Sequence, residues 1–281
     1  MKNLIKKVLY FKLPIKIGEK SFLIPIIKGV GINNLRLKND WFIFLLNRIN
    51  LPEHSYFIDV GVNIGQTLLK FRSHFDNPYY GFELNSNCVR YTRKLIKTNG
   101  IKDISIFPVG LSDKDEVVAL FSNDDIDNCC TDSTIVQNLR PNRYTDNDKS
   151  FVPVFRFDNL KLLKAGDCLS MIKIDVEGAE LEVIKGMIET IKEHRPLITC
   201  EVLDYYDSNL SSGKLQDKAN KLYDLIRSLD YDVYAIKQSN SNLNFEKLSE
   251  IKLNLWTPES LKSNDYLFIP ANNKYIYLKG N

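Results

Sequence analysis

The sequence lacks the features that mark several large classes of protein. It contains no run of about 20 apolar residues that could span a bilayer, and Lys6 and Lys7 interrupt the apolar N-terminus in a way unlike a signal peptide. The formal net charge is only +3, and no Arg-rich or Lys/aromatic stripe is present, so nucleic acid is not an expected partner. The chain is therefore expected to act without spanning a membrane.

Cysteine is also scarce. The five cysteines are an odd number without CxxC spacing, which indicates neither a disulfide framework nor a zinc site. Unbridged thiols are typical of the reducing cytoplasm, which is the expected location. With 281 residues, 44% of them hydrophobic and 26% charged, the composition is that of an ordinary globular protein.

Strands and helices alternate regularly from residue 56 onward. Short apolar runs are separated by amphipathic stretches of helical periodicity, which is typical of βαβ units. The sequence therefore predicts an α/β fold with a Rossmann-like, doubly wound, mostly parallel sheet and a terminal antiparallel hairpin. The predicted strands are 56–60, 78–82, 104–109, 117–121, 151–155, 171–175, 196–200, 231–236 and 266–269, and the predicted helices include 86–99 and 183–191.

Two regions lie outside this alternation. Residues 1–50 are predicted to form an N-terminal extension, with a short β-hairpin and a helix capped by Asp40, ahead of the main domain at 51–281. Residues 1–11 have an apolar helical face beside lysines, which suits either contact with a membrane surface or packing on the domain itself. The Asn- and Asp-rich loop at 122–150 is interpreted as a substrate lid or as a disordered insertion.

The first dense motif spans residues 56–65. Gly61 and Gly65 break an apolar strand before a helix begins, and ligands of such sheets bind outside the carboxyl ends of the strands. Gly61 lets the backbone turn sharply because it has no Cβ. Asp59 places a carboxylate in this strand, and a buried charge requires a partner, so a cationic ligand group or amide and water donors are expected to meet it.

Glu83 follows the second strand, where a carboxylate can accept hydrogen bonds from both hydroxyls of a ribose. A nicotinamide dinucleotide requires G-x-G-x-x-G spacing for its pyrophosphate, and this turn has Asn63 and Gly65 in the wrong places. Asp59 would also repel a pyrophosphate. A sulfonium amino-acid nucleoside, which has an ammonium group and no phosphate, suits the site better.

The second dense motif spans residues 172–180. It gathers the three carboxylates of Asp175, Glu177 and Glu180 about one turn. Asp175 closes a predicted strand and faces the expected cleft, and Gly178 permits the turn into the next helix. Glu177 and Glu180 could instead complement the amino end of that helix.

Residues 59–65 (DVGVNIG) and 173–180 (KIDVEGAE) together resemble the FkbM family of S-adenosylmethionine-dependent methyltransferases. The resemblance covers roughly residues 55–203. It implies a Rossmann-like methyltransferase domain and O-methylation, often of hydroxyls on sugars or secondary metabolites. Val62 stands where alanine is usual, and Leu84 stands where proline commonly follows the acidic residue.

The resemblance also implies a binding site for S-adenosylmethionine. The methionine part is expected beside the first glycine turn, the ribose at Glu83, and the adenine along Gly110 and Leu111. The expected donor-binding residues are Asp59, Gly61, Asn63, Gly65, Gln66, Thr67, Glu83, Gly110 and Leu111.

A hydroxyl acceptor requires a base, and the sequence favours a carboxylate. The three histidines, His54, His74 and His194, all fall at the amino-end face of the predicted sheet, away from the ligand. The candidate catalytic residues, in order of preference, are Asp175, Glu201 and Glu177.

Asp175 and Glu201 could also hold a divalent cation, but the sequence shows no third protein ligand, so no metal is predicted. The expected reaction is O-methylation of a sugar hydroxyl in a glycan or in its nucleotide-linked precursor, in bacterial polysaccharide biosynthesis. A non-catalytic adenosyl-binding domain and a nicotinamide oxidoreductase are the alternatives. The sequence leaves open the identity of the acceptor, O- versus N-methylation and the oligomeric state.

Overall fold

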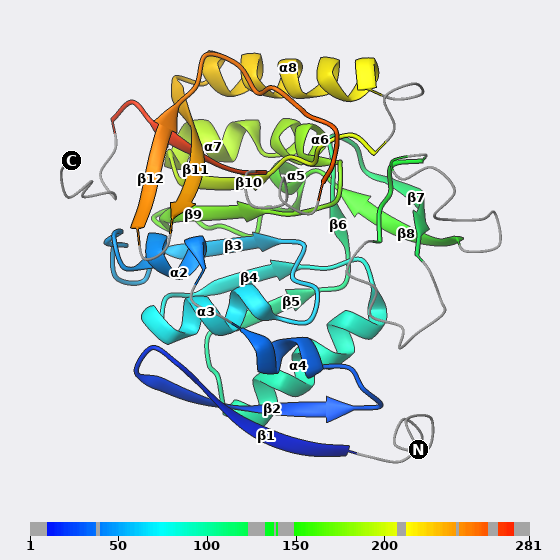
Figure 1. Ribbon diagram of the computed structural model, residues 1–281, viewed down its shortest axis with the longest axis vertical. Helices are drawn as coiled ribbons and strands as arrows, with labels where there is room; N and C mark the ends of the chain where they lie inside the picture. The colour runs from blue at the N-terminus through cyan, green and yellow to red at the C-terminus, as the bar shows by residue number, and fades with distance from the viewer. Residues whose placement is uncertain are drawn as a thin grey trace.

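The centre of the molecule is a mixed sheet with helices on both faces (Figure 1). The computed structural model describes residues 10–37, 40–122, 133–137, 139, 149–206, 212–239, 242–257 and 264–272. Five neighbouring strands are parallel, and three antiparallel strands extend the sheet at one edge. The order is β12 (Asn242–Lys247), β11 (Tyr231–Ser239), β13 (Asp265–Pro270), β10 (Leu197–Glu201), β9 (Leu169–Ile174), β3 (Tyr56–Val60), β4 (Tyr79–Phe82) and β5 (Ile104–Phe107).

The chain changes its direction of travel across the sheet between β3 and β9. From β3 it runs outward through β4 to β5, and it then returns to β9 and β10 on the other side of β3. Such a switch point opens a crevice at the carboxyl ends of the two central strands, where ligands bind. The predicted Rossmann-like class, mostly parallel with antiparallel C-terminal strands, is confirmed.

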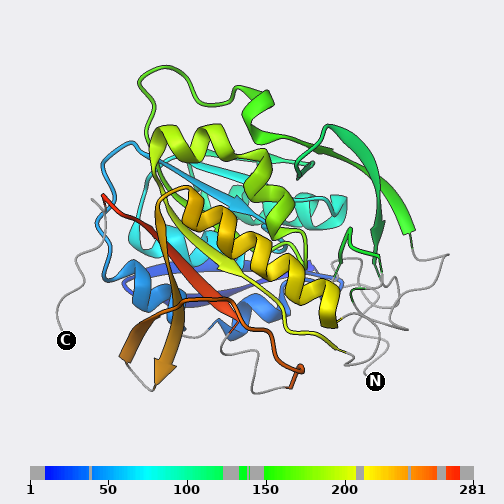
Figure 2. The same ribbon diagram turned by 90° about the horizontal axis from the view of Figure 1, so that it is seen from above.

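Helices cover both faces of the large sheet. They are α2 (Trp41–Leu46), α3 (Gln66–His74), α4 (Ser86–Asn99), α5 (Phe157–Leu160), α6 (Glu180–Gly186), α7 (Ile188–His194) and α8 (Ser212–Ser228), with a short 3-10 helix η1 (Ile32–Arg36). α2 and α3 pack on one face, where Phe71 meets Phe57 of β3. α6 and α8 pack on the other face, as the view from above in Figure 2 shows. The strands are therefore buried on both sides, as their near-continuous apolar sequences predict.

Two smaller sheets flank the large one. β6 (Gly110–Leu111), β8 (Lys149–Phe155) and β7 (Glu116–Phe121) form a three-stranded sheet beside the carboxyl ends of the central strands (Figure 1). β1 (Tyr10–Ile17) and β2 (Lys20–Ile27) form a hairpin that packs against α4. The N-terminal hairpin and the helix capped by Asp40 agree with the sequence-based expectation. The boundary between the extension and the main domain stays a prediction.

Three elements differ from the sequence-based prediction. The periodicity of residues 183–191 predicts one helix, but the structure has α6 and α7, separated at Met187. A Cβ on Gly186 would come within 2.0 Å of the carbonyl oxygen of Ser112, so this position must be glycine, which weakens the helix there. The third predicted strand stops at Phe107, because the chain leaves the large sheet to pair with β8. β12 is an additional strand.

The structure describes only part of two predicted segments. Residues 1–9 of the predicted amphipathic helix lie outside the described residues, and residues 10 and 11 belong to β1. Of the loop at 122–150, residues 133–137 and 139 are described in its interior. No helix in the described part of the chain is long and apolar enough to cross a membrane.

Candidate active site

A cavity of about 280 Å³ lies at the carboxyl ends of β3, β4, β9 and β10, at the switch point of the sheet. The strand register aligns Val60, Phe82, Ile174 and Cys200 side by side. The residue after each of these therefore lies at one level, and these residues are Gly61, Glu83, Asp175 and Glu201. Nine of the twelve predicted site residues line the cavity: Gly61, Asn63, Gln66, Glu83, Gly110, Leu111, Asp175, Glu177 and Glu201.

Asp59 is not on the cavity wall, contrary to the sequence-based expectation. It lies two residues below Gly61, level with Lys173 of β9, and it is fully buried. Its carboxylate accepts a hydrogen bond from the hydroxyl of Tyr79. Burial raises the pKa of Asp59 to about 6, although Lys173 and Tyr79 favour its charged form. The strand register thus places Asp59 one layer beneath the cavity, where its neighbours are Lys173 and Tyr79.

The glycine turn after β3 is held against the second motif. Gly61 has a φ of +94°, and a Cβ there would lie 1.8 Å from the carbonyl oxygen of Asp175. Glycine is therefore required by contact between two backbones and not by a ligand alone. Asn63 is also left-handed, with φ 48°. The other two predicted site residues, Gly65 and Thr67, lie behind the wall at the start of α3.

Both carboxylate oxygens of Glu83 accept backbone hydrogen bonds. Oε2 accepts from the N–H of Asn63 and Oε1 from the N–H of Asn85, each at 2.7 Å. Asn85 also caps α4 through its side chain, and Ser86 is the first residue of the helix. Burial raises the pKa of Glu83 to about 7, although the two N–H groups favour the charged form. Each oxygen retains a lone pair for a ribose hydroxyl.

Apolar side chains form the wall beside Glu83. Leu84 packs so closely on Gly110 that a Cβ there would come within 2.8 Å of the leucine. Leu111 and Leu120 continue this wall. The predicted adenine position along Gly110 and Leu111 therefore falls on an apolar surface, which suits the face of a purine ring.

A described part of the 122–150 loop also contributes to the wall. Ser133 and Ile135 line the cavity. Between them, Thr134 pairs with Phe121 in an antiparallel bridge, and its hydroxyl donates to the carbonyl of Glu177 at 2.6 Å. This segment thus forms part of the cavity wall, and the role of the loop as a substrate lid stays a prediction. No signal in the sequence pointed to these individual residues, because their position depends on a contact with a distant turn.

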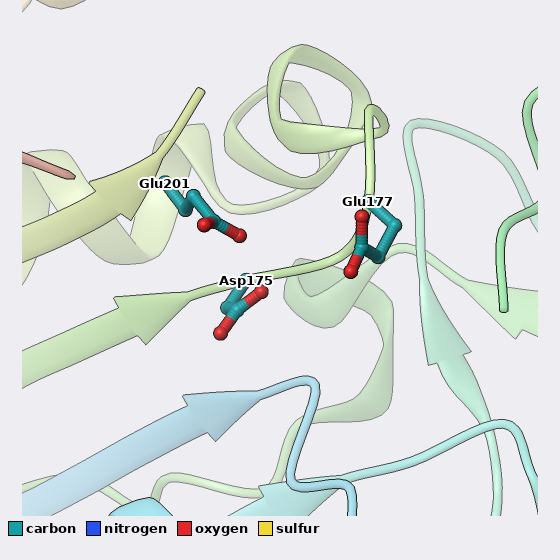
Figure 3. Close-up of side chains that lie close together, drawn as sticks. All are labelled: Asp175, Glu177 and Glu201. Atoms are coloured by element: carbon teal, nitrogen blue, oxygen red, sulfur yellow. The ribbon is translucent and has the colours of Figure 1, made fainter. Parts of the chain in front are cut away.

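Three carboxylates form another part of the cavity wall (Figure 3). Asp175 follows β9, Glu201 ends the neighbouring β10, and Glu177 lies in the turn that leads to α6. One oxygen from each lies within 4.8 Å of the others. Lys173 Nζ contacts Asp175 Oδ2 at 2.8 Å, and the lysine is only 9% exposed. Lys173 is a site residue that the sequence analysis missed, although a cation inside an apolar strand is itself a signal.

The pKa values of Asp175 and Glu201 are shifted in opposite directions. Burial alone raises the pKa of Asp175, but the Lys173 cation and a hydrogen bond with Glu201 outweigh it, so the pKa is lowered overall. Burial and the negative charge of Asp175 hold the pKa of Glu201 well above its usual range. Of the two carboxyl groups, Asp175 therefore loses its proton more readily, and Glu201 retains its proton more readily.

The same cluster offers the oxygen ligands that Mg²⁺ prefers. The structure supplies Glu177 as the third carboxylate that the sequence did not reveal. However, Lys173 already places a positive charge beside Asp175, and the raised pKa of Glu201 disfavours the charged form that would bind a metal ion. The absence of a metal requirement stays a prediction. The described residues that line the cavity include four carboxylates and no histidine. The identity of the catalytic base stays a prediction.

A sequence model of one family, the methyltransferase FkbM domain, matches residues 59–233, which is more than half of the chain. No curated protein sequence matches the chain.

Several solved methyltransferase structures are similar to the chain. Methyltransferase FkbM from Methylobacillus flagellatus KT has 16% identity and a TM-score of 0.48, over 83% of this chain and 48% of that one. SAH-bound PaMTH1 from Podospora anserina has 11% identity and a TM-score of 0.41, and the match covers 82% of this chain and 76% of that one. Precorrin-6y C5,15-methyltransferase from Geobacter metallireducens GS-15 has 10% identity and a TM-score of 0.38, and the match covers 81% of this chain and 85% of that one. This chain thus spans about half the length of the first protein, and the fold assignment stands on the strand order itself.

Proposed function

The chain belongs to the FkbM family of S-adenosylmethionine-dependent methyltransferases, and from this premise we propose that it methylates a sugar hydroxyl. The proposed acceptor is a glycan or its nucleotide-linked precursor, in bacterial polysaccharide biosynthesis in the cytoplasm. One observation carries the proposal of O-methylation: Asp175 lies on the cavity wall in contact with the Lys173 cation, which favours its charged form, and Glu83 lies across the central strands. A hydroxyl acceptor needs a proton acceptor of this kind.

In this proposal the donor lies across the strand ends. Its ribose hydroxyls donate to Glu83, its adenine rests on Leu84 and Leu111, and its methionine part lies along Gly61. The contact between Gly61 and the carbonyl of Asp175 supports this orientation, because it brings the methionine end beside the acidic cluster. Asp59 supports the turn from beneath instead of touching the donor.

Methyl transfer is an in-line displacement at a carbon that the sulfonium already activates. A lone pair of the acceptor hydroxyl forms the new C–O bond, while the C–S bond breaks and its electron pair goes to sulfur. The hydroxyl proton becomes strongly acidic as the bond forms, so Asp175 can accept it despite a lowered pKa. The hydrogen bond with Glu201 helps to hold Asp175 in place. The remaining contribution of the protein is alignment of donor and acceptor.

The donor is tested by calorimetric titration with S-adenosylhomocysteine and, separately, with NAD. Binding of S-adenosylhomocysteine without binding of NAD is expected, and the reverse result would refute the proposal. Product formation from a donor with a labelled methyl group then distinguishes an enzyme from a non-catalytic adenosyl-binding domain.

The acceptor is tested by mass analysis of cell-surface glycan from cells with and without this protein. The loss of one methyl group per repeating unit is the expected difference. An unchanged glycan mass, in cells whose protein still binds S-adenosylhomocysteine, would refute the proposed acceptor and leave the donor assignment standing.

A further inference from the structure

Positive charge is concentrated on the N-terminal hairpin and on α4. Residues 10–36 and 86–99 contain nine basic residues and one acidic residue, Glu19, which gives a net charge of +8, whereas the whole chain has only +3. The rest of the chain is therefore net acidic, at −5. The hairpin and α4 lie toward the bottom of Figure 1, on the opposite side of the molecule from α8. The molecule is thus electrostatically polarised, with its positive pole at the hairpin.

Apolar side chains are exposed among these charges. Tyr10, Phe11 and Leu13 of β1 are 50%, 37% and 39% exposed, and Leu23 of β2 is 42% exposed. The cross-strand partners of Phe11 and Leu13 on β2 are buried, so β1 overhangs the part of the hairpin that packs on α4. Single exposed hydrophobic residues are ordinary, but four in one hairpin are not. By strand alternation, Phe11 and Leu13 lie on one face of β1, whereas Tyr10, Lys12, Lys16 and Leu23 lie on the other face of the hairpin. The exposed edge of the hairpin thus presents apolar and basic side chains together.

The hairpin and α4 present this surface together. The Lys94 ammonium lies over the ring of Tyr10, 5.0 Å from its centroid. Lys12 and Lys16 are exposed on the same face of β1 as Tyr10, and Lys97 is exposed one turn beyond Lys94 on α4. We call the exposed side of residues 10–16, 23 and 90–97 the basic face.

We propose that the basic face binds the surface of a bilayer that contains anionic lipids. Its lysines and arginines are attracted to the anionic headgroups, and the side chains of Tyr10, Phe11 and Leu13 enter the boundary between headgroups and acyl chains. Lysine suits this position because its methylene stem can lie on apolar surface while the ammonium stays at the headgroups. α4 begins directly after Glu83 and its cap, so one helix joins the cavity wall to the basic face.

Two other occupants fit the basic face less well. A second copy of the chain could add a strand to β1, which pairs with β2 alone among the described residues. However, Pro14 has no N–H to donate, and the flanking lysines Lys12 and Lys16 repel their own copies, which are features that prevent edge pairing. RNA would satisfy the charges but would leave Phe11 and Leu13 without an apolar partner, because nucleic-acid interfaces are polar.

The test uses the full chain and sedimentation with lipid vesicles. Binding is expected to vesicles of phosphatidylcholine with phosphatidylglycerol and not to vesicles of phosphatidylcholine alone. Raising the ionic strength from about 0.01 to about 0.15 M should weaken binding steeply, because the Debye length falls from about 30 Å to about 8 Å. Equal binding to both kinds of vesicle, or binding to neither, would overturn the proposal. So would binding to a single-stranded RNA that persists when the anionic vesicles are not bound.

Matched variants locate the surface. The combined substitutions Lys12→Gln, Lys16→Gln and Lys97→Gln should weaken binding to anionic vesicles by about fivefold per charge, or about 100-fold together. The control removes three exposed lysines from the opposite side, on α7 and α8, with Lys192→Gln, Lys214→Gln and Lys221→Gln. If both triple variants lose the same affinity, only net charge matters and the basic face is not the site.

The apolar contribution has its own control. Leu13→Ser with Leu23→Ser should lower the binding that remains at high salt. Val117→Ser with Phe151→Ser should not, although Val117 and Phe151 are more exposed, at 66% and 71%. Equal losses from the two pairs would overturn the assignment. Affinity for S-adenosylhomocysteine should be unchanged in every variant, so a failure of docking is distinguishable from a failure of the proposed function.

Discussion

The turns after β3 and after β9 have similar backbones and different chemistry. Each contains a left-handed residue other than glycine, Asn63 in the first and Glu177 in the second. In each, a glutamate accepts a hydrogen bond from a backbone N–H of the turn. Glu83 accepts from Asn63 at 2.7 Å, and Glu180 accepts from the N–H of Gly178 at 2.8 Å. The two turns also touch, since no side chain can fit between them at residue 61.

The difference between the turns lies in their charged neighbours. Backbone N–H groups donate to both carboxylate oxygens of Glu83, which lies beside the first turn. The wall next to Glu83 continues with the apolar side chains of Leu84 and Leu111. The second turn gathers Asp175, Glu177 and Glu201 around the cation of Lys173. In the proposed function, these similar turns would hold the two ends of the donor, and only the second turn has the charged side chains that could move a proton.

Asp175→Asn should have the largest effect, because it removes the proton acceptor from the reactive turn. We expect turnover to fall by about 10²- to 10⁴-fold, with affinity for S-adenosylhomocysteine retained. Glu177→Gln is the matched control in the same turn and should cost less. Turnover is measured with a labelled methyl donor, and circular dichroism checks that both variants fold. A variant Asp175→Asn with wild-type turnover would remove this residue from the mechanism.

Gly61→Ala tests the contact that joins the two turns. The added Cβ would meet the carbonyl of Asp175, so we expect the free energy of unfolding to fall by about 2–5 kcal/mol. Gly166→Ala is the control, because Gly166 has nearly the same φ, +92°, but a Cβ added there would have no neighbouring atom within 4 Å. It should lose only about 1–2 kcal/mol from backbone strain. Equal losses in denaturant titrations would show that the contact is unimportant.

Local signals in the sequence predicted the elements that carry the site. The bounds of β3 follow from an apolar run that ends at Gly61, and α4 ends where Gly100 adopts the left-handed conformation expected of a helix terminus. Glu83, Asp175 and Glu201 were predicted at strand ends, and parallel strands bring such ends to one edge. These predictions needed only periodicity, glycine positions and the rule for switch points.

The features that the sequence did not predict depend on register and on distant contacts. A carboxylate near a strand end resembles a ligand-binding group in the sequence, but the register places Asp59 level with Lys173 and beneath the cavity. Lys173 stands out in the sequence as a cation in an apolar strand, but its partner Asp175 is identified only by the structure. Likewise, the position of Thr134 depends on a hydrogen bond to Glu177, 43 residues away. Sequence alone indicates which residues are near strand ends but not which layer they occupy.

Glu83 should make donor binding depend on pH, and this tests the first turn. Ribose hydroxyls donate to the charged carboxylate, whereas burial has raised the pKa of Glu83 to about 7 in the free protein. The proton must therefore leave when the donor binds, so affinity rises with pH. With this pKa, S-adenosylhomocysteine should bind about tenfold more weakly at pH 6 than at pH 8.

Calorimetry at several pH values measures this dependence. In Glu83→Gln the side chain does not titrate, so the affinity should be lower overall and should lose most of its change between pH 6 and pH 8. A pH dependence that survives in Glu83→Gln would assign it to another group, of which Asp59, with its pKa raised to about 6, is the nearest candidate in the same strand pair.

Removal of divalent cations should have the smallest effect, namely none on turnover. Lys173 already supplies a positive charge to Asp175, and the raised pKa of Glu201 disfavours a further negative charge in the cluster, so we expect that no metal ion is needed to hold these carboxylates together. The measurement is turnover after exhaustive chelation, with Mg²⁺ added back as the control. A loss of turnover that Mg²⁺ restores would show that Asp175, Glu177 and Glu201 bind a metal, and the second turn would then differ from the first by an ion as well as by its side chains.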